Sequence, residues 1–300
     1  MQEPVSKAPF FDRDCILGKG TYATVFAGEL GLAVKRIELH KINKKFEGRE
    51  EVAMKKMDHP NVLTLLDAVQ DRDFKYLIFE RCLGTVRDYI TGDPKYDGHM
   101  PSEVEALRQM ASGLAYIHSQ DVVHRDIKPE NVLISSAFIL KISDFGCCKS
   151  TAPDGSMSVT SGPQGTRIYF APEYLRLEGS NTTVEDRKNI RADKSIDIFS
   201  LGCLFFTYIV KKGAFIHLFA TPGRTYRNRE TYDHDVTRNI LKNNKFTEEN
   251  GIPSEHYAFE MINGMTQAQS KDRWVLDEGQ SQTNSVLGTL KKELEREQKK

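Results

Sequence analysis

The sequence predicts an α+β fold with two unequal lobes, a small β-rich lobe followed by a larger helical one. Four short β-type runs lie within the first 80 residues, at 24–27, 32–37, 62–67 and 76–79. A charged, helix-favouring stretch at 44–57 interrupts them. After about residue 100 the pattern turns helical, and in 103–118 apolar residues recur at steps of three and four. The length of 300 residues is enough for one large domain or two lobes.

Composition narrows the class of protein. The 42 Lys and Arg balance the 42 Asp and Glu, so no nucleic-acid partner is expected. Hydrophobic residues at 39% and charged residues at 28% are typical of an ordinary soluble globular protein. The five cysteines are odd in number and show no CxxC spacing, which disfavours a disulfide framework and a zinc site. A reducing compartment fits this cysteine usage better.

Neither a secretory signal nor a membrane segment is expected. Residues 1–14 lack a basic segment followed by an apolar run, so they do not form a secretory signal. The most apolar stretch, 201–210, is about half the length needed to cross a bilayer, and we expect no membrane segment. The expected location is cytoplasmic, or the cytosol-facing part of a longer membrane protein.

Three segments carry weaker signals. Residues 150–165 are rich in Ser, Thr, Gly and Pro, and residues 176–194 are polar without an apolar period, so both are expected to be exposed loops. Residues 286–300 form a charged helical pattern with Leu287, Leu290 and Leu294 on one face. This pattern is about two heptads long, too short for a coiled coil, and predicts a solvated or frayed end.

A glycine-rich turn and a lysine suggest a phosphate site in the first lobe. Gly18, Lys19 and Gly20 lie between two strand-like runs, and glycines let backbone N–H groups approach phosphate oxygens. The third glycine position holds Ala23, so a plain glycine-rich hairpin is the alternative. Lys35 ends an apolar strand and needs an anion, either a nucleotide phosphate or Glu50 on the following helix. The alternative is a surface lysine.

The segment 124–131, His-Arg-Asp-Ile-Lys-Pro-Glu-Asn, has the residues that phosphoryl transfer needs. Asp126 can accept the proton of a hydroxyl nucleophile, Lys128 can neutralise charge on the transferred group, and Asn131 can return to the site as a magnesium ligand. Asp144, which begins Asp-Phe-Gly, would be the second magnesium ligand. Taken singly, His124 could be a core histidine and Asp-Phe-Gly a turn.

These motifs, in this order, resemble the eukaryotic protein kinase family. Ala171-Pro172-Glu173 is similar to the end of its activation segment, 197–202 to the start of its buried central helix, and Arg273 to the arginine that pairs with that glutamate. Lys128 and the pair Gly165-Thr166 resemble the serine/threonine class. Residues 58–62, 113–119, 144–149 and 196–200 are most similar to the kinase part of the inositol-requiring enzyme family, the unfolded-protein-response kinase–endoribonucleases.

The resemblance implies a bilobal kinase fold with a domain layout and a nucleotide pocket. Residues 1–13 would be an extension and 14–275 the kinase domain, with an N-lobe at 14–80, a hinge at 80–83 and a C-lobe at 84–275; residues 276–300 would be a charged tail. It implies ATP and Mg²⁺ as cofactors, adenine bonded by the backbone of Glu80 and Cys82, and four apolar residues around the ring, Leu17, Val25, Ala33 and Leu133. The alternative for these four is plain core packing.

The resemblance also implies regulation by phosphorylation. Ser156, Ser158, Thr160 and Ser161 are candidate sites, modified in trans by a second copy in a homodimer. Arg125 would meet the added charge. The alternative is that these are ordinary polar loop residues.

The expected function is therefore that of an ATP-dependent serine/threonine kinase acting on protein substrates, in stress-type signalling. The alternative is a nucleotide-binding, kinase-like scaffold or regulator without turnover, although all the charged positions needed for turnover are present. About 27 residues follow Arg273, too few for a helical nuclease module, so ribonuclease activity is not expected.

Overall fold

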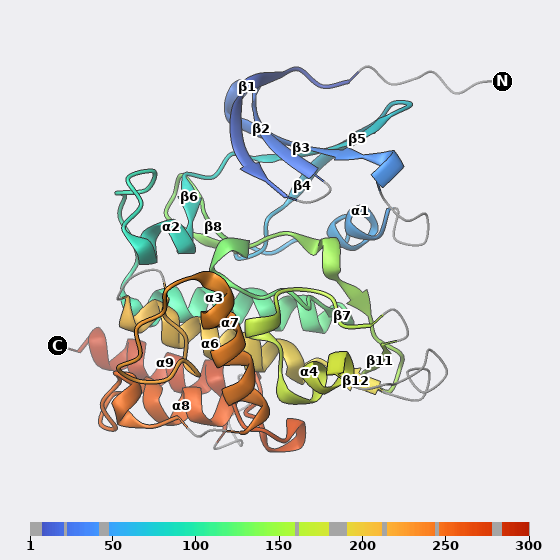
Figure 1. Ribbon diagram of the computed structural model, residues 1–300. Helices are drawn as coiled ribbons and strands as arrows, with labels where there is room; N and C mark the ends of the chain where they lie inside the picture. Colours follow the sequence, from blue (N-terminus) through green and yellow to red (C-terminus); the bar gives the residue numbers. More distant parts are fainter. Residues whose placement is uncertain are drawn as a thin grey trace.

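The computed structural model describes residues 8–20, 23–41, 48–159, 162–179, 191–211, 215–243, 246–277 and 284–299. A small β-rich lobe lies above a larger helical lobe, as the sequence predicts (Figure 1). The chain runs through the upper lobe first and crosses once into the lower one near residue 82.

The upper lobe is a five-stranded antiparallel sheet in the order β1-β2-β3-β5-β4. Its strands are β1 (Phe11–Lys19), β2 (Ala23–Gly28), β3 (Leu32–Glu38), β4 (Leu65–Gln70) and β5 (Phe74–Glu80), and helix α1 (Arg49–Met54) lies beside it. β1 starts at Phe11, three residues before the expected domain boundary at 14. Residues 11–13 therefore belong to the sheet and not to an extension.

The predicted run 62–67 is displaced from the strand that forms. β4 begins only at Leu65, because Val62 and Leu63 pair with the lower lobe instead. Val62 forms a parallel bridge with Ile142, and the Leu63 N–H donates to the Ile142 carbonyl oxygen at 2.9 Å. These two residues connect the lobes, a role that an apolar run cannot reveal by its pattern alone.

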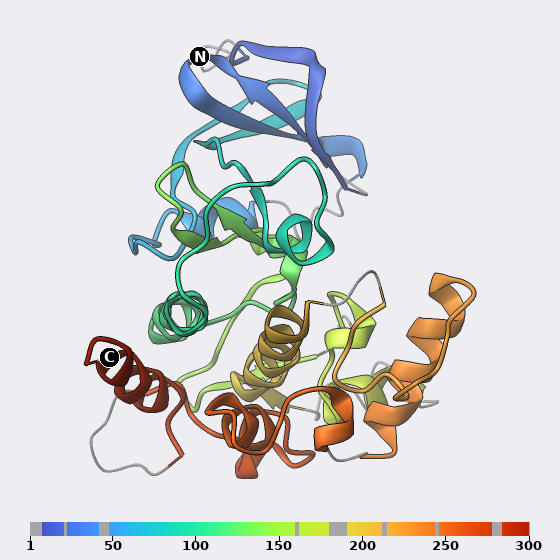
Figure 2. The same cartoon turned by 90° about the vertical axis from the view of Figure 1, so that its left-hand side faces the viewer.

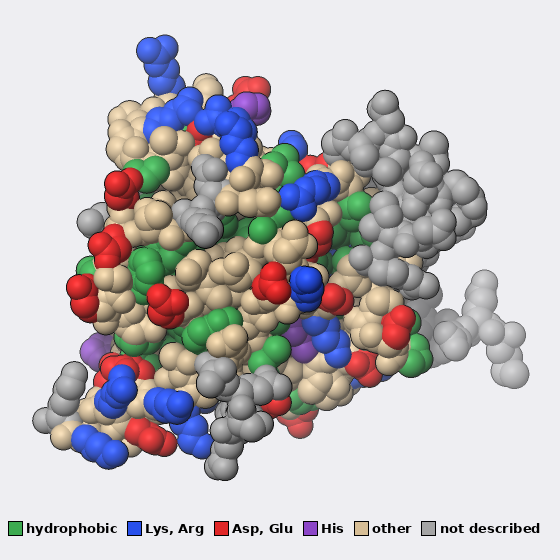
Figure 3. Space-filling view, turned by 90° about the horizontal axis from the view of Figure 1, so that it is seen from below, with side chains coloured by type: hydrophobic (Ala, Val, Ile, Leu, Met, Phe, Trp, Pro, Cys, Tyr) green, Lys and Arg blue, Asp and Glu red, His purple; other side chains and the backbone are tan. Residues whose placement is uncertain are grey.

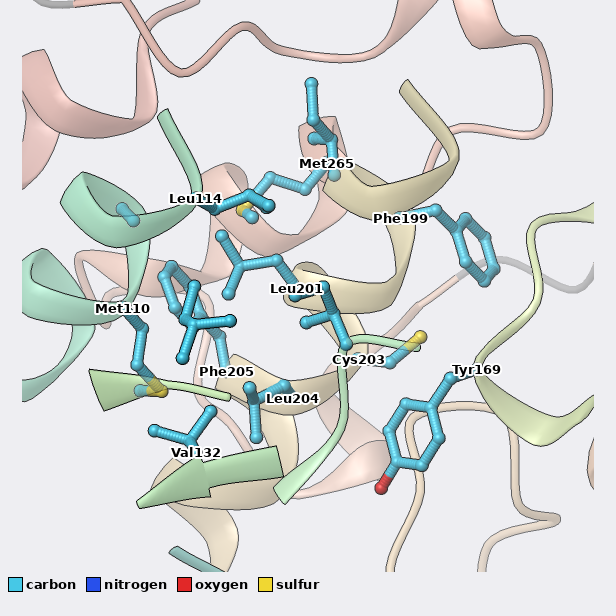
Figure 4. Close-up of a cluster of buried hydrophobic side chains, with 14 of the residues drawn as sticks. Met110, Leu114, Val132, Tyr169, Phe199, Leu201, Cys203, Leu204, Phe205 and Met265 are labelled. Atoms are coloured by element: carbon cyan, nitrogen blue, oxygen red, sulfur yellow. The ribbon is translucent and has the colours of Figure 1, made fainter. Parts of the chain in front are cut away.

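The lower lobe is built around α3 (Glu103–Ser119) and α6 (Ser195–Val210). The Ser102 hydroxyl accepts the Glu105 N–H at 3.3 Å and so caps the start of α3. α6 packs on α8 (Ala258–Met265), and α3 packs on two short strands that precede site residues. Figure 4 shows Met110 and Leu114 of α3 facing Leu201 and Phe205 of α6.

The remaining elements surround this core. The helices are α2 (Val86–Thr91), α4 (Pro172–Gly179), α7 (Arg229–Leu241) and α9 (Val286–Glu297). The short strands are β6 (Gly84–Thr85), β7 (Val122–Val123), β8 (Val132–Ile134), β9 (Leu140–Ile142), β10 (Lys149–Ser150), β11 (Ser156–Ser158) and β12 (Arg191–Asp193). In the described part of the chain, no helix combines the length and apolar character that crossing a membrane requires.

The expected frayed end at 286–300 is wrong. α9 lies along α3 (Figure 2), and Val286, Leu287 and Leu290 are buried. The Ser285 hydroxyl accepts the Gly288 N–H at 3.0 Å, which fixes where the helix begins. The apolar face of this helix therefore completes the core of the lower lobe, and the charged tail expected at 276–300 is largely part of the domain.

The two expected exposed loops are also only partly loops. β11 pairs antiparallel with β12, and Met157 and Val159 are buried. α4 occupies the beginning of 176–194, and residues 180–190 lie outside the described part. On the face of the lower lobe seen from below, acidic and basic side chains are both spread across the surface (Figure 3), in keeping with the balanced composition.

Candidate active site

Three charged side chains from distant parts of the chain meet at the boundary between the lobes. Lys35 on β3 places its Nζ 2.6 Å from Glu50 Oε1 on α1 and 2.8 Å from Asp144 Oδ1, which follows β9. The predicted pairing of Lys35 with Glu50 is confirmed. Asp144 is the more accessible partner, with 46% of its side chain exposed against 12% for Glu50. Its carboxylate is therefore the one able to meet a ligand.

The charges of these three groups are set by one another. Burial raises the pKa of Glu50, against the opposing effect of Lys35. Burial acts to lower the pKa of Lys35, but the two carboxylates outweigh it and raise that pKa above its usual value. The positive charge of Lys35 holds the pKa of Asp144 at about 2. At neutral pH the site therefore presents an ammonium group and an ionised aspartate.

Asp126 lies on the loop between β7 and β8 and is held by three neighbours. Its Oδ1 accepts a hydrogen bond from the Thr166 hydroxyl at 2.8 Å. Its Oδ2 accepts from Lys128 Nζ at 2.7 Å and from Asn131 Nδ2 at 3.0 Å. Lys128 Nζ also donates to the Thr166 oxygen at 2.8 Å. The carboxylate and the ammonium group are thus bridged by one hydroxyl, which fixes both.

The sequence pattern assigns Thr166 no catalytic or binding role, although the pair Gly165-Thr166 resembles the serine/threonine class. It reaches Asp126 because Gly165 has φ of 117° and passes against the Arg125 carbonyl oxygen. A Cβ at Gly165 would lie 2.2 Å from that oxygen, so only glycine fits. The identity of residue 165 was therefore a usable signal for this contact.

The donor set of Asn131 and Asp144 suits magnesium. Asn131 Nδ2 donates to the Asp126 carbonyl oxygen at 2.8 Å as well as to its carboxylate. Because both bonds use the amide nitrogen, the amide oxygen is the atom left to bind a cation. One carboxylate and one amide oxygen are hard ligands of the kind that Mg²⁺ takes together with phosphate oxygens and water. These two residues would hold the ion beside the phosphates.

A buried aspartate on α6 fixes the backbone of the 124–131 segment. Asp197 accepts the N–H groups of His124 at 2.7 Å and Arg125 at 2.8 Å, and its Oδ2 lies 2.9 Å from His118 Nε2. Arg125 has φ of 70°, an uncommon conformation for a bulky residue, and these bonds stabilise it. The sequence places Asp197 at the start of a helix, and nothing in the local pattern indicates this contact.

Most of the predicted nucleotide residues lie on or beside strands of the upper sheet, and Leu133 lies on β8 of the lower lobe. Gly18 pairs with Val25, and Val25 pairs with Lys35, so register alone brings the turn next to the lysine. The Gly20 N–H donates to the Ala23 carbonyl oxygen at 2.8 Å and closes the turn. Of the other predicted residues, Leu17 and Lys19 lie on β1, Ala33 lies on β3 and Leu133 lies on β8. Residues 21–22 lie outside the described part.

The backbone of the predicted hinge, residues 80–83, has partners on both sides. The N–H groups of Arg81 and Leu83 donate to Gly31 at 2.9 Å and to Ile134 at 2.7 Å. Cys82 lies between these two positions, and burial raises the pKa of its thiol to about 12, so the thiol is neutral at pH 7. The side chain of Glu80 binds Lys141 Nζ at 2.8 Å. An adenine edge would therefore meet backbone atoms here and not the glutamate carboxylate.

The four candidate phosphorylation sites have different surroundings. Ser158 Oγ lies 2.9 Å from Lys149 Nζ, whereas Ser156 Oγ donates to Asp154 Oδ1 at 2.6 Å. Thr160 and Ser161 lie outside the described residues.

The end of the activation-like segment is held by the arginine that the sequence predicted. Arg273 donates two parallel hydrogen bonds to the Glu173 carboxylate, each 2.7 Å long. The predicted pairing of Arg273 with Glu173 is confirmed. Paired bonds of this kind hold an arginine and a carboxylate in one orientation.

Comparison with known proteins agrees with this geometry. A family model described as protein kinase domain matches residues 11–283. The human serine/threonine-protein kinase/endoribonuclease IRE2 is 34% identical over 261 residues, covering 79% of this chain and 26% of that protein. The Caenorhabditis elegans serine/threonine-protein kinase/endoribonuclease ire-1 is 34% identical over 211 residues, covering 66% of this chain and 20% of that protein.

A relative of another kind is the Arabidopsis thaliana receptor-like kinase LIP2, 30% identical over 220 residues, with 68% of this chain and 37% of that protein covered. The chain thus spans about a fifth to a quarter of the length of the kinase/endoribonuclease relatives it matches. The family model covers nearly the whole chain, and the site residues lie at the boundary between the two lobes. The chain belongs to the protein kinase domain family.

Proposed function

We propose that this chain is a serine/threonine protein kinase that transfers the γ-phosphoryl group of Mg·ATP to hydroxyl groups of proteins. The observation that carries the proposal is the bridged arrangement of Asp126, Lys128 and Thr166. It places a carboxylate acceptor next to an ammonium group on the loop between two strands, while Lys35 and Asp144 lie at the same boundary of the lobes.

Each side chain has one role in this mechanism. The substrate hydroxyl approaches Asp126, which accepts its proton as the new oxygen–phosphorus bond forms. Lys128 stabilises the negative charge on the transferred group, and Lys35 holds the phosphates of ATP in line. The bond from the γ-phosphorus to the bridging oxygen breaks, and ADP leaves with that oxygen. Magnesium, when bound at Asn131 and Asp144, supplies positive charge beside the phosphates.

Phosphate transfer from labelled ATP to a generic basic protein tests the proposal. Asp126→Asn keeps the shape of the side chain but removes the proton acceptor, and we expect the rate to fall by roughly 10²- to 10⁴-fold. Asp97→Asn is the matched control, because Asp97 is exposed and is not among the side chains that bond Asp126.

The outcomes separate the kinase from the scaffold. If the wild type binds ATP but transfers no phosphate, even after treatment with an activating kinase, the protein is a nucleotide-binding regulator and not a kinase. Equal transfer by wild type and Asp126→Asn would remove Asp126 from the proposed role.

The finer part of the proposal is autophosphorylation in trans by a second copy, with Ser158 as the preferred of the two described sites. A phosphoryl group on Ser158 would lie beside the Lys149 ammonium group, whereas one on Ser156 would meet the Asp154 carboxylate. A homodimer would form at least transiently for this step. A cytosol-facing role in stress-type signalling is supported only by the resemblance to the kinase/endoribonucleases.

Mass analysis of the active protein before and after phosphatase tests this part. We expect phosphate on Ser158 in excess of Ser156, with a rate per molecule that rises with protein concentration. Ser158→Ala should remove that phosphate, and Ser156→Ala should leave it in place. A concentration-independent rate would contradict transfer between copies.

A further inference from the structure

A cavity of about 140 Å³ lies in the lower lobe between α4, α6, α7 and α8. Its floor is apolar and buried, and consists of Phe199, Phe219, Ile240 and Phe246. The rings of Phe199 and Phe219 are stacked, with centroids 5.6 Å apart and planes within 10°. An apolar cavity of roughly 150 Å³ holds one benzene molecule. The volume is therefore that of a single aromatic ring.

The rim of the cavity has a different chemistry. Asn243, Asn263 and Gln267 line it, and all three are more exposed than the floor, with Asn243 on the surface. Gln267 Nε2 donates to the Asn263 carbonyl oxygen at 2.9 Å, which leaves the Gln267 amide oxygen as an acceptor. Buried apolar walls with a few polar groups at the mouth are typical of small-molecule sites.

The wall of the cavity also positions the anchor of the activation-like segment. The carbonyl oxygen of Gln267 accepts from Arg273 Nε at 2.8 Å, and the guanidinium group lies 5.2 Å from the centre of the Phe199 ring. That same guanidinium group binds Glu173. The residue before Glu173, Pro172, lines the cavity. Figure 4 shows Phe199 pointing away from the core cluster around Leu201. Two residues that line the cavity, Gln267 and Phe199, therefore contact the arginine that holds Glu173.

We propose that this cavity binds a free small molecule with one aromatic ring and a carboxamide-type polar edge. The ring lies on the apolar floor, and the edge bonds the amides of the rim. The occupant stabilises the Gln267 and Phe199 walls, and through them the Arg273–Glu173 anchor. The volume accommodates one ring, and the amides at the rim favour a ring that carries its own polar group. This proposal is independent of phosphoryl transfer.

Benzamide is the probe, toluene is the comparison without a polar edge, and the Ile240 methyl resonances report on the floor of the cavity. We expect both compounds to shift these resonances, with a Kd for benzamide on the order of 1 mM and weaker binding of toluene. Saturating benzamide should also slow amide hydrogen exchange at Tyr174, which follows Glu173. No shift of the Ile240 methyl resonances with either compound would overturn the proposal.

Two variants place the binding in this cavity. Ala268→Leu fills it from the wall, because Ala268 lines it and is only partly exposed, and should weaken benzamide by about tenfold or more. Gln269→Leu adds the same side chain one residue further on, at an exposed position outside the lining, and should change the affinity less than about twofold. Equal affinity in both variants would show that the probe binds elsewhere.

Asn243→Gly is the second variant, and keeps the test valid if Ala268→Leu does not fold. Asn243 has φ of 55°, which glycine adopts without strain. Loss of the rim amide should weaken benzamide by roughly 2- to 10-fold and leave toluene unchanged, because only benzamide has a polar edge. An equal effect on both compounds, or none on benzamide, would contradict the amide contact.

Discussion

Replacement of Thr166 by alanine tests whether one hydroxyl organises the catalytic loop. The hydroxyl donates to Asp126 at 2.8 Å and accepts from Lys128 at 2.8 Å, so its loss removes one hydrogen bond from each of two charged groups. If the transition state loses one such bond, worth about 1.5–3 kcal/mol for a charged partner, the rate falls roughly 10- to 150-fold. Thr166 acts through Asp126 and Lys128 and is a positioning residue.

The assay is steady-state phosphate transfer with varied ATP, together with thermal unfolding. We expect Thr166→Ala to lower kcat and to leave the KM for ATP and the Tm nearly unchanged, because Thr166 bonds neither the Lys35 cluster nor the core. Thr166→Ser keeps the hydroxyl and should stay within about threefold of the wild-type rate. A rate for Thr166→Ala within about threefold of the wild-type rate, or equal losses in Thr166→Ala and Thr166→Ser, would refute the positioning role of the hydroxyl.

The remaining predictions concern charge, packing and the segment anchor. Because Lys35 holds the pKa of Asp144 at about 2, Asp144 stays ionised from pH 5 to 8, and ¹³C NMR of its carboxyl group should show no titration in that range; Lys35→Met should raise this pKa. The lowered pKa of Asp144 stabilises the folded state at every pH above about 3.8, the ordinary pKa of an aspartate. This stabilisation is lost as the pH falls through about 2. Leu290→Ala should lower the free energy of unfolding by about 2–5 kcal/mol in denaturant titration, because Leu290 is buried between α9 and α3, whereas Glu295→Ala on the exposed face should change it by less than about 0.5 kcal/mol. A small loss for Leu290→Ala would mean that α9 is not part of the core. Arg273→Lys cannot form two parallel bonds and should increase protease cleavage near residue 173; unchanged cleavage would contradict the anchoring role.

Much of the fold and part of the site follow from local pattern. The apolar period of 103–118 predicted α3, and the strand-like runs predicted β2, β3 and β5, because the helical and strand periods are written into neighbouring residues. Lys35 follows an apolar run in the sequence and lies within β3, and a buried ammonium group needs an anion, so its contact with Glu50 could be predicted without coordinates.

Other contacts depend on how the chain returns to the same place. Thr166 is 40 residues from Asp126 and Asp197 is 73 from His124, and neither distance in sequence carries a local signal. The left-handed backbone of Arg125 is stabilised by Asp197 and is not encoded by the residue itself. These contacts exist only once α6 and the 162–170 segment pack beside the loop.

The helix at 286–297 shows the limit most clearly. Sequence alone determined that it is amphipathic, but an apolar face of about two heptads fits a frayed end and a core contact equally well. The tertiary structure decided between them, because α9 packs against α3 and Leu287 and Leu290 are buried. Periodicity specifies which face of an element is buried, whereas the partner is specified only by the packing of the whole chain, since burial is favourable on any matching surface.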